Sequence, residues 1–276
     1  MPSFTSSDGL RLVYDDIGPR GGTPLVICHG LAATAEQMAA DAAYFAGLGY
    51  RVLVPDLRGH GRSGKPQPVS PQALSIARLA DDHVEMLDHA ATGPVHWLGN
   101  SLGGILGLEL LGAHEHRMRS FATYGTAYAL DLPAWGARAI PLAYGIAGRG
   151  LVGRLTAWAT TRDKAVRPLL EKLVSQFDPV IGGALAANLT RYDLIANAVA
   201  ARLPILMLRG GLDRSVNSAL GPTIAAMRDR PNFTLAELPQ GGHCANLDAT
   251  DAFRAALLRF WEAIGDGRPA TRSSTA

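Results

Sequence analysis

The sequence predicts an α/β fold in which a mostly parallel sheet carries helices on both faces. Short, continuous apolar runs recur over residues 24–28, 51–55 and 94–98, as is typical of strands buried on both faces. Stretches with helical spacing lie between these runs, and strand–helix alternation along a chain favours a parallel sheet. The length of 276 residues fits one open sheet with inserted helices.

Turn-forming residues and caps delimit the elements of the first quarter of the chain. Gly9 comes directly before the first strand. Thr34 is the expected N-cap of the first helix, because its hydroxyl can accept a hydrogen bond from a free backbone N–H. The predicted elements are, in order, strands over 10–14 and 24–28, a helix over 34–48, a strand over 51–55, and an irregular loop over 56–66 that is rich in glycine and charge.

The same alternation continues to the end of the chain, with one interruption. Asp248 is expected to cap the last helix, and the polar tail over 265–276 is expected to be disordered. The remaining elements are predicted as a helix over 71–91, strands over 94–98, 120–124, 202–209 and 233–238, and a final helix over 248–264.

The interruption lies between Gly125 and Ala201, where the spacing is helical and no strand-like run occurs. We interpret residues 126–201 as a helical cap inserted into a core made of 1–125 and 202–264. Such a cap would lie over the carboxyl ends of the strands, where ligands enter. The large aromatic side chains of this segment then either line a substrate pocket or only pack the cap against the core; the predicted pocket residues are Trp135, Tyr144 and Trp158.

A G-x-S-x-G pattern joins the strand over 94–98 to the apolar stretch that follows it. Gly99 and Gly103 flank Ser101, which is the pattern of a sharp strand-to-helix turn carrying a nucleophile. The strained backbone at the tip leaves no room for side chains two positions away, and glycine supplies that room. Ser101 is therefore the candidate nucleophile.

Composition and charge argue against several other functions. The 26 basic and 24 acidic residues are scattered and leave a net charge of +2, so there is no nucleic-acid footprint. Two cysteines, Cys28 and Cys244, form neither a disulfide framework nor a zinc-ligand set and are expected to be buried thiols. No basic and apolar signal segment and no membrane-length apolar run occurs. We therefore expect a cytoplasmic protein with no nucleic-acid partner, no membrane span, no metal and no cofactor.

Several motifs in a fixed order point to one family. His29-Gly30 follows a buried strand, the 56–66 loop follows another, and Ser101, Asp213 and His243 each follow a later strand. In this order and spacing the chain resembles the α/β-hydrolase fold family, in its serine carboxylesterase and lactonase-like branch. The resemblance implies a mostly parallel sheet of eight strands, with the cap inserted after the sixth.

A serine nucleophile needs a base, and histidine suits this task because its unperturbed pKa is about 6.5. His243 lies in a Gly-Gly-His loop between the last strand and the last helix and is the predicted base. The other seven histidines are interpreted as packed, loop-bracing or solvated: His29, His60, His83, His89, His96, His114 and His116.

The acid must hold the histidine tautomer and stabilise its cation. Asp213 follows a buried strand and matches the position that the family uses. Asp131 after the sixth strand is the alternative, because some members of the family use that position. The resemblance also implies an oxyanion hole made by the backbone N–H groups of Leu31 and Leu102, which would bind the tetrahedral intermediate.

These residues predict a cofactor-free serine hydrolase that cleaves a small-molecule ester or lactone with an apolar acyl part. A serine at the turn argues against the dehalogenase and epoxide-hydrolase branches, which carry aspartate there. A carbon–carbon bond hydrolase, a perhydrolase or haloperoxidase-like enzyme, an acyltransferase, and a ligand-binding receptor on the same scaffold remain alternatives. The oligomeric state is open.

Overall fold

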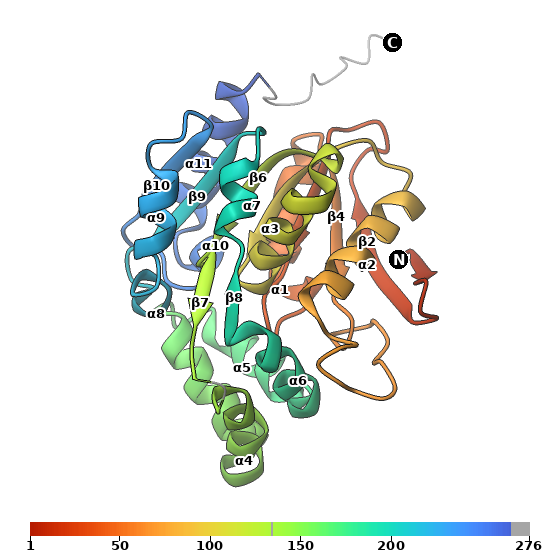
Figure 1. Ribbon diagram of the computed structural model, residues 1–276, viewed down its shortest axis with the longest axis vertical. Helices are drawn as coiled ribbons and strands as arrows, with labels where there is room; N and C mark the ends of the chain where they lie inside the picture. The colour runs from red at the N-terminus through yellow and green to blue at the C-terminus, as the bar shows by residue number, and fades with distance from the viewer. Residues whose placement is uncertain (134, 266–276) are drawn as a thin grey trace.

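The computed structural model describes residues 1–133 and 135–265. Figure 1 shows a twisted sheet between two layers of helices. Its strands lie in the order β1-β2-β4-β3-β5-β6-β9-β10, and only the β1–β2 and β2–β4 pairs are antiparallel, which confirms the predicted mostly parallel sheet of eight strands. The strands are β1 (Ser3–Thr5), β2 (Arg11–Ile17), β3 (Pro24–Cys28), β4 (Arg51–Asp56), β5 (Val95–Asn100), β6 (Met118–Tyr124), β9 (Ile205–Gly210) and β10 (Phe233–Leu238).

Helices cover the sheet on both faces. Thr34 caps α1 as predicted, since its side chain accepts a hydrogen bond from the N–H of Glu36. The helix after β5 is apolar on all sides and is buried between the sheet and α2. The helices of this core are α1 (Ala35–Gly47), α2 (Ile76–His89), α3 (Leu102–His114), η1 (Glu115–Arg117), α8 (Arg214–Asn217), α9 (Gly221–Met227), α10 (Ala245–Asp248) and α11 (Thr250–Ala263).

The strand order places the site. Within the sheet, β4 lies next to β3 on one side and β5 lies next to β3 on the other, so the chain reverses its direction across the sheet after β4. Such a reversal opens a crevice at the carboxyl ends of the two central strands, where ligands bind in open α/β sheets. The loop after β3 begins with His29-Gly30, and β5 ends next to Ser101. Both motifs therefore meet at one edge of the sheet.

The segment between β6 and β9 includes α4, α5 and α6, which form the lower part of Figure 1, and α7, which packs against α3 and α9. This segment is mainly helical, but it also contains an antiparallel two-stranded ribbon, so the expectation that it has no strand was wrong. The helix α4 contains Pro141 and bends at Gly148, where φ is 76°. The elements are β7 (Ala129–Asp131), α4 (Gly136–Thr160), α5 (Arg167–Gln176), α6 (Pro179–Leu189), β8 (Arg191–Asp193) and α7 (Ile195–Ala200).

One of the eight strands was not located in the sequence, and two other expectations differ from the structure. The strand that was not located, β1, lies at the N-terminus, where it pairs with β2. The helix predicted over 71–91 begins only at Ile76, because Ser75 caps it by accepting a hydrogen bond from the N–H of Arg78. The predicted last helix is two helices, α10 and α11, and Asp248 ends the first instead of capping the second.

Two further expectations concern the C-terminal tail and membrane spans. The tail that was expected to be disordered lies, from residue 266 onward, outside the described residues. Over the described ranges, no helix has the length and apolar character needed to cross a membrane.

Candidate active site

Ser101 occupies the sharp turn between β5 and α3. Its φ is 50°, a left-handed conformation that a side chain rarely adopts. A Cβ at Gly99 would collide with the backbone of Gly103, and a Cβ at Gly103 would collide with the backbone of Cys28. The two glycines are therefore required by the close approach of three chain segments. The turn holds the serine backbone in one strained conformation at the edge of the sheet.

Asp213 and His243 come together from the loops after β9 and β10. The Nδ1–H of His243 donates to Oδ2 of Asp213 at 2.9 Å, and the aspartate side chain is 6% exposed. The other carboxylate oxygen of Asp213 accepts from the N–H of Val216 at 3.2 Å. Because Nδ1 carries the donated proton, Nε2 of the neutral imidazole is left as an acceptor. This is the tautomer that a general base needs.

The loops that carry this pair are fixed to each other and to the nucleophile turn. Leu212 donates its N–H to the carbonyl of Gly241 at 2.9 Å. A Cβ at Gly210 would lie 2.6 Å from the carbonyl oxygen of Gly242, so the two loops pack too closely for a side chain. Asn100, the residue before the nucleophile, donates from Nδ2 to the carbonyl of His243 at 3.2 Å. The loop that carries His243 is thus held by hydrogen bonds both to the Asp213 loop and to Asn100.

Ser101 and His243 both line one cavity of about 490 Å³ under the helices of residues 126–201. Its walls are mainly aliphatic and aromatic, which favours an apolar ligand. The lining residues are Gly30, Leu31, Ala32, Ala33, Gln37, Asn100, Ser101, Ala139, Ile140, Ala143, Tyr144, Val152, Thr156, Thr160, Leu170, Leu173, Val174, Phe177, His243 and Cys244.

The two expected oxyanion donors lie next to this cavity. Leu102 is the first residue of α3, so its N–H has no partner within the helix. Leu31 lines the cavity directly. Its loop is braced by Asp56, whose Oδ1 accepts from the N–H of Ala35 at 2.8 Å. Leu102 follows Ser101 directly and Leu31 lines the cavity, and these are the places that the expected oxyanion hole requires.

His29 and His60 brace the same loops, as the sequence predicted. His29 donates from Nδ1 to the carbonyl of Gly30 at 2.8 Å, and its Nε2 accepts from the N–H of Leu57 at 3.2 Å. The ring of His60 lies 5.2 Å from that of His29 and stacks on Phe177 at 4.8 Å. Burial lowers the pKa of His29 to about 4 and that of His60 to about 3, so both rings are neutral at ordinary pH.

The alternative acid lies elsewhere in the molecule. Asp131 is on β7 of the ribbon, exposed to solvent, and forms an ion pair with Arg191 at 3.1 Å. The contact to the imidazole of His243 is made by Asp213 instead. Asp248 has a role that the sequence did not suggest: its Oδ2 accepts from the N–H of Gly242 at 2.9 Å. Its other oxygen accepts from the Thr161 hydroxyl at the end of α4, so the carboxylate joins the histidine loop to the cap helix.

The three aromatic residues predicted to line the pocket are placed differently from one another. Tyr144 lines the cavity and donates its hydroxyl hydrogen to the carbonyl of Val174 at 2.6 Å, which ties α4 to α5. Trp135 is 71% exposed and Trp158 is 58% exposed, and neither lines the cavity. Trp135 comes directly before α4 and Trp158 lies near its end, and the positions of α4 that line the cavity are taken by other residues, among them Ile140 and Val152.

The remaining histidines and cysteines are mostly internal. His83 is buried in α2, where its Nδ1 donates to the carbonyl of Leu79 at 2.7 Å, although solvated surface was expected. His96 is packed inside β5, as predicted. Cys28 and Cys244 are free and buried, and burial raises the pKa of both thiols well above the ordinary value. They are therefore inert thiols beside the site.

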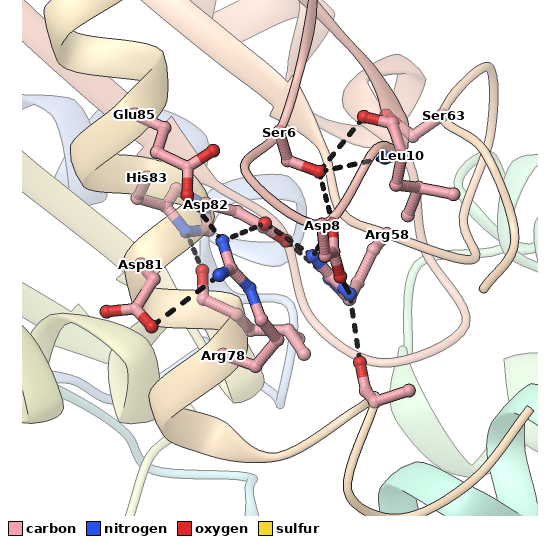
Figure 2. Close-up of polar contacts among 12 residues, drawn as sticks. Ser6, Asp8, Leu10, Arg58, Ser63, Arg78, Asp81, Asp82, His83 and Glu85 are labelled. Atoms are coloured by element: carbon pink, nitrogen blue, oxygen red, sulfur yellow. Dashed lines mark hydrogen bonds and ion pairs between the residues drawn. The ribbon is translucent and has the colours of Figure 1, made fainter.

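A buried ion-pair network next to the 56–66 loop was not suggested by the sequence (Figure 2). The guanidinium of Arg58, which is fully buried, donates two hydrogen bonds of 2.6 Å to Asp82 of α2 and one of 2.8 Å to Asp8. The hydrogen bond from Arg58 holds the pKa of Asp8 well below its usual range. The network fastens the loop that carries His60 to α2 and to the N-terminal strands. The sequence around Arg58 has no pattern that indicates a buried side chain, so this network could not be predicted from it.

Known proteins with similar sequences or folds have several activities. Over 107 residues, which are 38% of this chain and 36% of the other, the sequence is 39% identical to a non-heme chloroperoxidase of Streptomyces lividans. The enol-lactonase from Burkholderia xenovorans has a similar structure, with a TM-score of 0.83 and 21% identity over 95% of this chain and 100% of that chain. An esterase from Rhodococcus gives a TM-score of 0.81 and 21% identity over 96% and 99% of the two chains.

At these identities the two solved structures show a shared fold and no more. The family is shown by a sequence match that spans most of the sheet. The match covers residues 23–250, from the start of β3 to the start of α11, and thus includes the nucleophile turn and the loops of Asp213 and His243. The chain belongs to the α/β-hydrolase fold family.

Proposed function

We propose that this hydrolase is a serine esterase or lactonase that cleaves a small-molecule substrate with an apolar acyl part. One observation carries the proposal: a His243–Asp213 pair at 2.9 Å shares an apolar cavity with a serine held in a strained turn. A nucleophile, a base and an acid that orients the base are the parts that acyl transfer requires. The core of residues 1–125 and 202–264 would supply these parts, and the cap of residues 126–201 would supply the pocket.

The reaction would run in two halves. Nε2 of His243 takes the hydroxyl proton of Ser101 while the serine oxygen attacks the carbonyl carbon. The N–H groups of Leu31 and Leu102 hold the resulting oxyanion, and Asp213 stabilises the imidazolium. The imidazolium then gives its proton to the departing alkoxide, which leaves as an alcohol. Water repeats the sequence on the acyl-enzyme and releases the acid and the free serine.

A direct test uses a fluorophosphonate probe followed by a screen of substrates. The probe should label Ser101 in the native protein and no residue in the Ser101→Ala variant. A panel of esters and lactones with graded acyl lengths then identifies the preferred class. Failure of labelling at Ser101 in a folded protein would show that the serine is not activated and would favour the receptor alternative.

A second candidate is supported by the likeness to the chloroperoxidase of Streptomyces lividans. In this alternative hydrogen peroxide replaces water in the second half-reaction, so that the acyl-enzyme is released as a peracid. The peracid would then oxidise a halide in solution. Assays of halogenation in acetate buffer with bromide and peroxide separate the two functions, because a pure esterase would show no peroxide-dependent halogenation.

The rate constant kcat/KM for an ester is expected to rise with pH through a single ionisation. His243 accepts the serine proton only in its neutral form, so the rate increases as this residue loses its proton. His29 and His60 would not add a second step, because burial lowers their pKa values to about 4 and about 3. The measurement is a pH profile of the wild type, of His243→Gln and of His116→Gln, an exposed control. A His243→Gln enzyme with the wild-type profile and rate would exclude His243 as the base.

The preference for acyl chain length is expected to depend on the walls of the cavity and not on the exposed tryptophans. Each methylene of a longer acyl chain buried against these walls should stabilise the transition state by about 0.8 kcal/mol, or about fourfold in kcat/KM. Ala143→Phe fills the cavity, so it should flatten this trend and leave the shortest ester nearly unaffected. Trp158→Ala is the matched control on the same helix and should keep the trend. The reverse result would place the acyl chain outside this cavity.

A further inference from the structure

Helix α4 presents apolar side chains on both of its sides. Its inner side lines the cavity with Ile140, Tyr144 and Val152. On the outer side Leu142 is 60% exposed and Ile146 is 79% exposed. A helix with two apolar sides is normally buried, since water-facing positions of a surface helix are polar. We therefore expect an apolar partner to cover the outer side of α4.

Exposed apolar residues lie on both segments of α4, before and after the bend at Gly148, and are here called the outer α4 patch. Leu151 and Leu155 are four residues apart and Trp158 follows after three, the spacing that puts side chains on one side of a helix. In Figure 1, α4 forms the lower extremity of the molecule, away from the sheet. More than half of the large apolar side chains that are exposed in the described ranges belong to this patch: Trp135, Leu142, Ile146, Leu151, Leu155 and Trp158.

The segment that carries the patch is strongly basic. Residues 132–170 contain six basic residues and one acidic residue, whereas the whole chain has 26 and 24, so the rest of the chain carries 20 basic and 23 acidic residues. Although basic residues occur along the whole chain, α4 and the residues that follow it carry a net positive charge, and α4 itself has no acidic residue. The charged residues of this segment are Arg138, Arg149, Arg154, Arg162, Asp163, Lys164 and Arg167.

Two arginines lie where they would meet a surface in contact with the patch. The side chain of Arg154 is 70% exposed and makes only a long contact, of 3.9 Å, with the carboxylate of Glu171 on α5. The guanidinium of Arg162 lies 5.9 Å from the centre of the Trp158 ring. Arg149, in contrast, donates to the carbonyl oxygens of Ser175 and Phe177 and is turned toward α5. Exposed tryptophan and aliphatic side chains with arginines beside them are the composition of a segment that lies in a membrane interface.

We propose that the outer α4 patch docks the protein on an anionic lipid surface. The apolar side chains would enter the boundary between head groups and acyl chains, while Arg154 and Arg162 meet the lipid phosphates. A second copy of the chain fits this surface less well. A twofold dimer would place two patches of the same positive charge against each other. The docking does not depend on the proposed reaction, and the Ser101→Ala variant should bind lipid as the wild type does.

Cosedimentation of the full chain with vesicles tests the docking. The wild type should bind mixed phosphatidylglycerol–phosphatidylcholine vesicles, and binding to pure phosphatidylcholine should be weaker. Added salt should weaken only the binding to the anionic vesicles. Arg154→Gln with Arg162→Gln should lower the affinity about 30-fold, since each basic residue near such a surface contributes about fivefold. Leu142→Ser with Ile146→Ser should lower it at least about tenfold by removing apolar contact.

Matched controls carry the same chemical changes elsewhere. Leu235→Ser on β10 and Arg259→Gln on α11 alter exposed residues far from the patch and should leave binding unchanged. Thermal melts establish that all variants are folded, which is expected because the changed side chains are solvated. Equal binding to neutral and anionic vesicles, or equal binding by the patch variants and the controls, would overturn the proposal. A dimer that Ile146→Ser dissociates, together with no vesicle binding, would overturn it in favour of a second copy.

Discussion

Ser101→Ala is expected to lower kcat by about 10⁶-fold, the size of effect seen when the serine of an analogous triad is removed. The hydroxyl oxygen of Ser101 is the atom that bonds to the substrate carbon in the proposed reaction. The neighbouring Thr126 hydroxyl donates to the backbone carbonyl of Ser101, so it is held in a structural contact. The loss should fall on kcat more than on KM, because the cavity walls that hold the acyl group are unchanged. Single-turnover and steady-state measurements on the best ester of the screen would give both constants.

Folding should survive this substitution. The strained turn is maintained by the close contacts of Gly99 and Gly103 with neighbouring backbone, and the serine side chain caps nothing in α3. An unchanged melting temperature is therefore expected, with Ser218→Ala, on the exposed end of α8, as the control that keeps full activity. A folded Ser101→Ala variant that retains the wild-type rate would remove Ser101 from the mechanism.

The sheet was predictable because its signals are local. Each buried parallel strand is a continuous apolar run, and each is followed by a turn whose residues can be read one by one. The strand β1 was missed because it has only three residues and alternates in burial, so no run is visible. The ribbon of β7 and β8 was missed for the same reason: each strand has three residues, and their pairing joins positions that are far apart in the sequence.

The place of the candidate site in the fold was predictable, because it depends on the order of motifs along the chain. Ser101, Asp213 and His243 are each tied to the end of a strand, and parallel strands bring those ends together. The supporting contacts are different. Asn100 and Asp248 hold the His243 loop through backbone groups. Such contacts depend on how loops pack in three dimensions, and no sequence spacing encodes them.

The cap was the least predictable part. Its helical character follows from spacing, but the direction in which each side chain of α4 points depends on the bend at Gly148 and on packing against α5 and α6. Tyr144 therefore lines the cavity whereas Trp135 and Trp158 face outward. The expectation that large aromatics face the substrate assumed that apolar residues are turned inward. Because exposed apolar side chains also lie along α4, this assumption was wrong for two of the three aromatic residues.

Asp213→Asn is expected to lower kcat by about 10⁴-fold, as for the equivalent change in a serine protease triad. In the structure the carboxylate accepts the Nδ1 proton of His243 at 2.9 Å. An amide in its place can donate to Nδ1 and thereby favours the tautomer with the proton on Nε2, which cannot accept the proton of Ser101. The carboxamide oxygen can still accept from the N–H of Val216, so the fold should persist. Steady-state kinetics and a thermal melt of the variant measure both effects.

Asp131→Asn is the matched control and also tests the alternative acid. Asp131 is exposed and pairs with Arg191 on the surface ribbon, so this substitution should change kcat by less than about twofold and stability by at most about 1 kcal/mol. Fluorophosphonate labelling separates the two variants as well, because an activated serine is needed for reaction. Labelling should become slow in Asp213→Asn and stay fast in Asp131→Asn. If labelling were slow in Asp131→Asn and fast in Asp213→Asn, the acid would be Asp131 of the ribbon after β6. The hydrogen bond between Asp213 and His243 would then have only a structural role.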